Sequence, residues 1–181
     1  MKTSGKSAKP RSSAAKPSAE ALPTEAPAPR RRAWLMKCEP AAYTIDDLQR
    51  DGTTSWEGVR NYQARNFMRD MKLGDEVLFY ASNADPSGVT GIAEISREAY
   101  PDPFALKKDH KYFDEKATKD DPIWVSVELR FVEKFDDIVP LETLKSAKGL
   151  EEMVVTKKGS RLSIQPVTAR EFEIVAKLGR R

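Results

Sequence analysis

The sequence is poor in the residues that most often carry catalysis or hold a metal. It contains one cysteine, Cys38, and one histidine, His110. A single cysteine excludes an internal disulfide and a cysteine-based zinc cluster. Nucleophilic triads and dyads need a histidine base beside the nucleophile. We interpret His110, which lies in a polar stretch, as a solvated side chain and Cys38 as a small packed thiol. These shortages favour a binding protein over an enzyme.

Other signatures are also missing. The glycines are scattered, so no phosphate-cradling glycine loop is present. The paired acidic residues are neighbours in the chain and therefore cannot share one face of a helix or strand. No apolar run approaches the length of a membrane span, and the N-terminus lacks the apolar segment of a secretory signal. We therefore expect no cofactor, no metal and no membrane association.

Positive charge is concentrated at the N-terminus. Residues 1–32 contain no aromatic residue, isoleucine or valine, and carry eight basic and two acidic residues, a net charge of +6. Such a segment cannot bury enough apolar surface to offset the entropy of ordering it, so we predict a disordered basic tail rich in Pro, Ala and Ser. The remaining residues, 33–181, hold 23 basic and 26 acidic side chains, a net charge of −3. The predicted domain therefore lacks a broadly basic surface, and contact with nucleic acid would have to be local.

Hydrophobic periodicity predicts a mixture of strands and helices after residue 32. Strands are expected at 33–37, 75–81, 89–100 and 123–131, with a final strand or loop at 161–164. Helices are expected after Thr44, from Asn61 to a close at Gly74, over 141–147 and from Thr168 to Gly179. A turn is expected at 52–55 and a long polar excursion at 101–122. The order of elements indicates an α+β domain with a curved antiparallel sheet or a small barrel.

The strand at 75–81 is apolar at both parities. Val77 and Phe79 point to one face, and Leu78 and Tyr80 point to the other. A strand buried on both faces suits a small barrel with helices packed outside it.

Three short stretches place aromatic rings near amide, hydroxyl and guanidinium groups. Trp56 precedes Asn61 and Tyr62, Tyr80 precedes Ser82 and Asn83, and Arg161 precedes Ser163. A nucleobase site uses these types, because an aromatic ring stacks on the base while amides and hydroxyls read its edge. Structural roles remain open for the same residues. The aromatic rings could pack in the core, Asn61 could cap a helix, and Ser82 and Asn83 could form a turn.

Longer motifs, in a fixed order, extend this pattern over residues 34–178. They are WLMKCEP at 34–40, SWEGVRNYQARNFMRDMKLGD at 55–75, VLFYASN at 77–83, GVTGIAEI at 88–95, EAYPDP at 98–103 and RLSIQPVT at 161–168. In these motifs the chain resembles the EVE domain family. The resemblance implies a PUA-like fold, a small β-barrel with peripheral helices. It implies no catalysis, and a concave pocket for a modified base flipped out of DNA or RNA.

The family's pocket motifs fall on nine residues here, which we take as the predicted nucleic-acid-binding residues: Lys37, Trp56, Asn61, Tyr62, Tyr80, Ser82, Asn83, Arg161 and Ser163. Two positions depart from the common family pattern. Cys38 stands where the family commonly has serine, and a thiol forms weaker hydrogen bonds than a hydroxyl. Ala81 stands where the family commonly has histidine. Both departures leave the choice of base open.

The leading hypothesis is therefore a non-catalytic, monomeric module that binds nucleic acid carrying a modified base. One alternative is an enzyme or accessory factor acting on RNA or nucleotides. Another is a protein-interaction domain with a small-molecule pocket. In a bacterium we expect a cytoplasmic protein, and in a eukaryote a nuclear one.

Overall fold

A computed structural model describes residues 31–181. The predicted tail up to residue 30 lies outside the described residues. Six strands form one sheet in the order β2-β5-β4-β3-β1-β6. Their bounds are β1 Ala33–Cys38, β2 Thr53–Trp56, β3 Glu76–Ala81, β4 Gly88–Pro101, β5 Val125–Pro140 and β6 Ile164–Val167. The helices are α1 Ile45–Asp51, α2 Tyr62–Asp70, α3 Leu141–Ser146 and α4 Ala169–Gly179, with short 3-10 turns at Pro103–Leu106 and Val154–Thr156.

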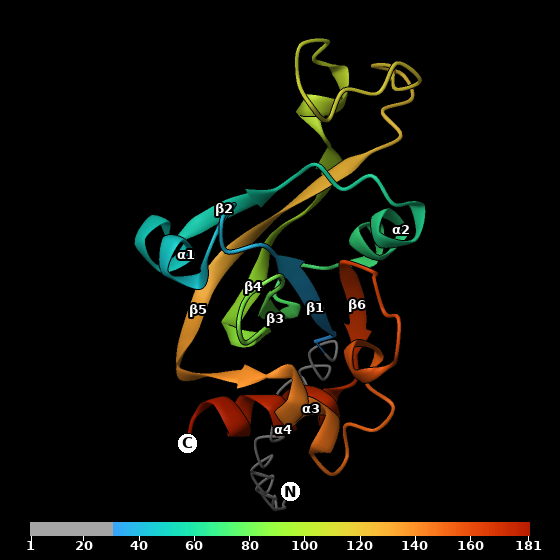
Figure 1. Cartoon of the computed structure of the whole chain (residues 1–181). Helices are drawn as coiled ribbons and strands as arrows, with labels where there is room; N and C mark the ends of the chain where they lie inside the picture. Colours follow the sequence, from blue (N-terminus) through green and yellow to red (C-terminus); the bar gives the residue numbers. More distant parts are fainter. Residues whose placement is uncertain (1–30) are drawn as a thin grey trace, which may run out of the picture.

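The pairing is antiparallel except between β1 and β3, which run parallel. The sheet bends strongly across its long strands β4 and β5 (Figure 1). The fold is α+β, as predicted. The predicted barrel is corrected: the sheet is open, because its outer strands β2 and β6 are not paired with each other.

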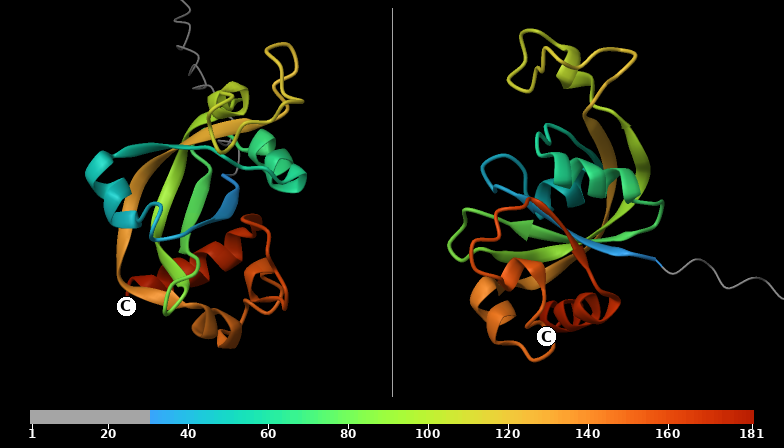
Figure 2. Two further views of the ribbon diagram at one scale, coloured as in Figure 1. Left: turned by 45° about the horizontal axis from the view of Figure 1, so that its top comes forward. Right: turned by 90° about the vertical axis from the view of Figure 1, so that its right-hand side faces the viewer.

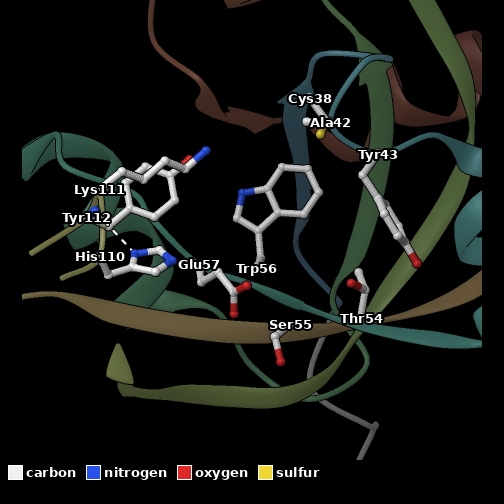
Figure 3. A pocket seen from close by; sticks show the side chains of 10 residues that line it. All are labelled: Cys38, Ala42, Tyr43, Thr54, Ser55, Trp56, Glu57, His110, Lys111 and Tyr112. Atoms are coloured by element: carbon white, nitrogen blue, oxygen red, sulfur yellow. Dashed lines mark hydrogen bonds between the residues drawn. The ribbon is translucent and has the colours of Figure 1, made fainter. Parts of the chain in front are cut away.

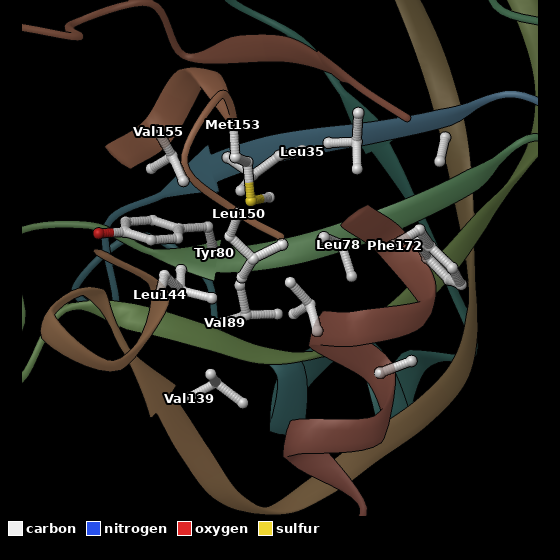
Figure 4. Packing of buried hydrophobic residues seen from close by; sticks show 14 of the residues in the cluster. Leu35, Leu78, Tyr80, Val89, Val139, Leu144, Leu150, Met153, Val155 and Phe172 are labelled. Atoms are coloured by element: carbon white, nitrogen blue, oxygen red, sulfur yellow. The ribbon is translucent and has the colours of Figure 1, made fainter. Parts of the chain in front are cut away.

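Helix layers on both faces of the sheet explain why the barrel need not close. One apolar cluster joins Trp34, Met36 and Phe79 to residues of α1 and α2. A second cluster joins Leu35 and Leu78 to residues of α3 and α4 (Figure 4). The apolar pattern at both parities of 75–81 fits such a three-layer arrangement as well as it fits a barrel.

Short sequence motifs determine where helices α1 and α4 begin. Thr44 and Asp47 form a complete capping box on α1, and Thr168 and Glu171 form one on α4. In each box a side chain satisfies backbone N–H groups that have no partner within the helix. Both helices therefore begin at the predicted residues.

Strand extents were predicted less well. A turn was expected at 52–55, but residues 53–55 belong to β2 and only Gly52, with a φ of 78°, makes the turn. Strand β5 continues nine residues beyond the expected end at 131, to Pro140. Its register with β4 shifts at several points, so the simple alternation that marks its first half is lost.

Residues 102–124 form a lobe beyond the ends of β4 and β5 (Figure 2). The lobe has a small core of its own, built from Ala105, Ala117 and Trp124. The predicted polar excursion is thus an ordered lobe, called the excursion below. Within residues 31–181, no helix is long and apolar enough to cross a membrane. The same residues contain no cluster of three or more potential metal-ligating side chains.

Candidate functional site

A pocket of about 330 Å³ opens where β2 faces the end of β1 and the excursion (Figure 3). Its volume lies at the lower end of the range for small-ligand sites, about 300–1,000 Å³. Three parts of the chain, far apart in sequence, line it: Cys38, Ala42 and Tyr43; Thr54, Ser55, Trp56 and Glu57; and His110, Lys111 and Tyr112. We call it the Trp56 pocket.

Trp56 stands at the centre of this pocket, between Tyr43 on one side and the excursion on the other (Figure 3). Its indole meets the buried Phe79 ring edge-on, with centroids 5.8 Å apart and planes at 85°. This packing anchors the half-buried indole while it lines the pocket. Within residues 31–181 its Nε1–H has no hydrogen-bond acceptor, whereas those of Trp34 and Trp124 donate to Asp75 and Asp114. Trp56 therefore offers the pocket both an aromatic surface and an available donor.

The walls beside Trp56 differ in chemistry. The Tyr43 hydroxyl donates to Asp51 at 2.8 Å, which fixes its ring. Burial raises the pKa of the Cys38 thiol, so Cys38 presents an uncharged, soft surface. Partial desolvation raises the pKa of the Glu57 carboxyl, and the nearby Asp102 carboxylate raises it further. Among residues 31–181, Glu57 is the only carboxylate that lines the pocket.

Arg60 fastens the excursion to the rest of the domain. Its guanidinium donates to the backbone carbonyl of Tyr112, with Nε at 3.0 Å, and to the Asp102 carboxylate at 2.9 Å. Asp102 is fully buried and also accepts from the backbone N–H of Gly58 and of Phe104, each at 2.9 Å. A buried carboxylate with three donors is well satisfied. This network fixes the position of the excursion wall.

Gly58 permits the close approach of that wall. Its φ is 77°, and a Cβ added there would overlap the Tyr112 ring. Only glycine adopts this backbone conformation without steric cost and leaves room for the ring.

His110 lines the rim of the pocket and is half-buried, where the sequence suggested a solvated side chain. Its ring stacks on Phe104 with centroids 4.1 Å apart. Its Nδ1 accepts the backbone N–H of Tyr112 at 3.2 Å. Neutral histidine with an acceptor at Nδ1 carries its proton on Nε2, which is then a donor at the rim.

Three other predicted residues line a separate pocket of about 290 Å³. Lys37, Tyr80 and Arg161 border it together with the loop at 157–160. Lys37 and Cys38 are consecutive in β1 and so face opposite sides of the sheet. The predicted site is thus divided between two pockets. Of the nine predicted residues, Trp56 is the one that lines the Trp56 pocket.

The remaining five predicted residues line neither pocket. Asn61 caps α2, its side chain accepting from the N–H of Ala64 at 2.9 Å. Tyr62 is 58% exposed, and its ring packs against that of Trp124 at a tilt of 35°, with centroids 4.9 Å apart.

Three of those five lie near the end of β1. Asn83, in a left-handed conformation with a φ of 51°, donates to Glu39 at 2.7 Å. The backbone N–H of Ser82 donates to the carbonyl of Cys38, and the carbonyl of Ser163 accepts from the N–H of Lys37. These contacts brace the strand end that separates the two pockets.

Three of the lining residues that sequence reasoning missed come from the excursion, and the other six lie near the end of β1 and along β2. His110, Lys111 and Tyr112 reach the Trp56 pocket across more than 50 residues of chain. The motif EAYPDP at 98–103 contains Asp102, the partner of Arg60, and was the one available signal. Nothing in residue periodicity indicates where a long polar segment folds back.

Comparisons with known proteins agree with the resemblance seen in the motifs. The family model described as EVE domain matches residues 32–178. Thymocyte nuclear protein 1 of Homo sapiens is 43% identical over 164 residues, covering 80% of this chain and 72% of that protein.

Solved structures also match. A protein from Pseudomonas syringae is 46% identical with a TM-score of 0.78, covering 81% of this chain and 98% of that one. Human THYN1 protein, crystallised in complex with 5-methylcytosine containing DNA, is 41% identical with a TM-score of 0.76, covering 83% and 98%.

Proposed function

The chain belongs to the EVE domain family, and on that premise we propose that it is a non-catalytic module that binds DNA carrying a modified base of the 5-methylcytosine class. The observation that carries the proposal is the Trp56 pocket, a single hollow with an aromatic platform and a mixed polar rim. The human relative solved with 5-methylcytosine containing DNA supports the choice of ligand.

A base can enter such a pocket only after leaving its stack. Flipping costs a few kcal/mol, and stacking on an aromatic side chain returns about 1–3 kcal/mol per base. We propose that the Trp56 ring supplies this stacking surface and that the excursion wall closes over the other side of the base. Tyr112, held by Arg60, is the aromatic group on that wall.

The polar rim suits the edge of a cytosine. A carboxylate is a natural acceptor for the exocyclic amine of cytosine, and Glu57 is the lining residue able to act in this way. The hydroxyl of Thr54 adds a donor and an acceptor. The small surfaces of Cys38 and Ala42 offer an apolar contact for a methyl group.

The titratable groups of the pocket support binding without chemistry. A thiol nucleophile needs a lowered pKa, and burial raises the pKa of Cys38 instead. The Nδ1 atom of His110 is occupied by a backbone N–H. We further propose that the domain works as a monomer without a metal, and that its curved open sheet is a variant of the PUA-like barrel.

Substitution of Trp56 tests the proposal. We expect Trp56→Ala to weaken binding to a 5-methylcytosine oligonucleotide by about 5- to 150-fold, the equivalent of about 1–3 kcal/mol of stacking. Trp56→Phe keeps an aromatic face and should retain most of the affinity. Fluorescence anisotropy measures both, and circular dichroism checks the fold. Equal affinity in wild type and a folded Trp56→Ala variant would show that the base does not enter this pocket.

A further inference from the structure

The second pocket, which we call the cationic pocket, is lined by five positively charged side chains and no carboxylate from the part of the chain that the structure describes. These are Lys37, Lys145, Lys157, Lys158 and Arg161. By contrast, residues 33–181 together have a net charge of −3. Five cations around a hollow of about 290 Å³ are therefore a local departure from the charge of the domain. Such a concentration attracts a compact anion.

Two of the five cations are already paired at the surface. Lys145 lies 3.0 Å from Glu142, and Lys157 lies 2.9 Å from Glu152. Both pairs are exposed, so they exchange readily with an arriving anion. Within residues 31–181, Lys158 and Arg161 have no carboxylate within 4.0 Å. These two side chains are the cations most available to a ligand.

The loop that carries Lys158 and Arg161 is held in place by hydrogen bonds from Gln165 and Lys37. Gln165 is buried, and its amide donates to the Ser160 hydroxyl at 2.9 Å and to the Leu162 carbonyl at 2.8 Å. The Lys37 ammonium donates to the Ser160 carbonyl at 3.0 Å. A ligand that meets a loop already fixed in this way loses less free energy to ordering.

Lys37 also sits in a partly desolvated position. Burial lowers the pKa of its ammonium, because the charged form loses hydration and gains only a neutral carbonyl partner. An anion in the cationic pocket would give this ammonium the negatively charged partner that it lacks. The half-buried lysine thus favours an anionic ligand over a neutral one.

The position of the pocket relates it to the Trp56 pocket. Lys37 lines the cationic pocket, and the next residue, Cys38, lines the Trp56 pocket. The two hollows therefore flank the same end of β1, on opposite faces of the sheet. A nucleotide strand carries a phosphate on either side of each base, so one strand that passes this end of β1 has both a base for the Trp56 pocket and a phosphate for the cationic pocket.

We propose that the cationic pocket is a phosphate site, which holds a backbone phosphate of the DNA strand whose modified base enters the Trp56 pocket. The class of anion rests on the proposed function. Arginine and lysine are the side chains that hold phosphate oxygens, through charge-assisted hydrogen bonds. The contact carries no sequence information, so it contributes affinity and register while the Trp56 pocket supplies selectivity.

The test removes the two most available cations together. The variant is Lys158→Ala with Arg161→Ala, both at exposed positions. The matched control is Lys177→Ala with Arg170→Ala, which removes one lysine and one arginine from the exposed face of α4. The affinity of the full chain for an oligonucleotide with one 5-methylcytosine, and for its unmodified counterpart, is measured over a range of salt concentrations.

We expect the pocket variant to bind both oligonucleotides more weakly, with the ratio between them unchanged. The slope of log affinity against log salt should become shallower by about 0.9 for each duplex phosphate that is no longer neutralised, or about 0.7 for a single strand. The control should keep the wild-type slope. A slope equal in the pocket variant and the control overturns the phosphate site, and so does a weakening confined to the modified oligonucleotide. If wild type does not distinguish the two oligonucleotides yet the slope still falls, the proposed function fails and the phosphate site stands.

Discussion

At the scale of single residues, Gly58 connects backbone conformation to the shape of the Trp56 pocket. Its positive φ and its contact with the Tyr112 ring are both incompatible with a side chain. Gly52 offers a matched comparison, because its φ is 78° and a Cβ there would meet nothing within 4 Å. Comparing substitutions at the two glycines therefore distinguishes the effect of backbone strain from the effect of displacing Tyr112.

We expect Gly58→Ala and Gly52→Ala to lower stability by a similar amount from strain alone, about 1–2 kcal/mol. Only Gly58→Ala should also weaken binding to 5-methylcytosine DNA, because Tyr112 must move away from the pocket. Thermal denaturation and the oligonucleotide affinity are measured for both variants. Equal binding losses in the two variants would mean that Tyr112 does not contribute a wall.

Among the nine site residues predicted from the sequence, roles that depend on neighbouring residues could be predicted, and roles that depend on distant contacts could not. A capping role for Asn61 is open from the sequence, and Asn61 caps α2 in the structure. Trp56 lines the pocket, but its neighbours there could not be derived, because Tyr112 and His110 arrive through contacts distant in sequence. Lys37 and Arg161 lie in another hollow, since alternation along β1 sends Lys37 away from Cys38.

At the scale of elements, the excursion over residues 102–124 acts as a wall, and the ion pair between Arg60 and Asp102 is one of the contacts that attach it to the domain. Arg60 is 23% exposed at its side chain, while Asp102 is completely buried. Removing one partner of a buried pair leaves an uncompensated charge or unsatisfied donors, at a cost of roughly 3–5 kcal/mol. Because the excursion has its own small core, this cost should appear first as local opening.

We expect Asp102→Ala to reduce the protection of amide hydrogens in residues 102–124 more than in the sheet, and to weaken binding of modified DNA. Asp120→Ala, at an exposed position in the same excursion, should change neither property. Hydrogen exchange followed by mass spectrometry measures the effect. Protection that falls evenly over the whole domain would contradict a separately attached wall.

Elements with strong local signals were predictable from the sequence, and the arrangement of the sheet was not. The starts of α1 and α4 follow from capping boxes that need only four residues each. The choice between an open sheet and a barrel depends on whether β2 and β6 meet, which no local pattern encodes. Strand β2 is not predicted because the run from Gly52 to Ser55 has the composition of a turn.

At the scale of the whole molecule, two hollows of different chemistry lie at one end of the parallel strand pair β1 and β3. The Trp56 pocket is aromatic with a polar rim, and the cationic pocket is bordered by five basic side chains. The helix layers on both faces of the sheet hold the two hollows in fixed relation (Figure 1). In the proposed function, the Trp56 pocket supplies selectivity for the base and the cationic pocket supplies charge attraction.

The three tryptophans allow the central claim to be tested in one spectrum. The indole N–H groups of Trp34 and Trp124 are bonded to carboxylates, and that of Trp56 faces the pocket without an acceptor in residues 31–181. In a proton–nitrogen correlation spectrum, 5-methylcytosine DNA should shift the Trp56 indole signal strongly and leave that of the buried Trp34 in place. Unmodified DNA should shift the Trp56 signal much less. Binding of modified DNA with no change at Trp56 would contradict recognition of the base in this pocket.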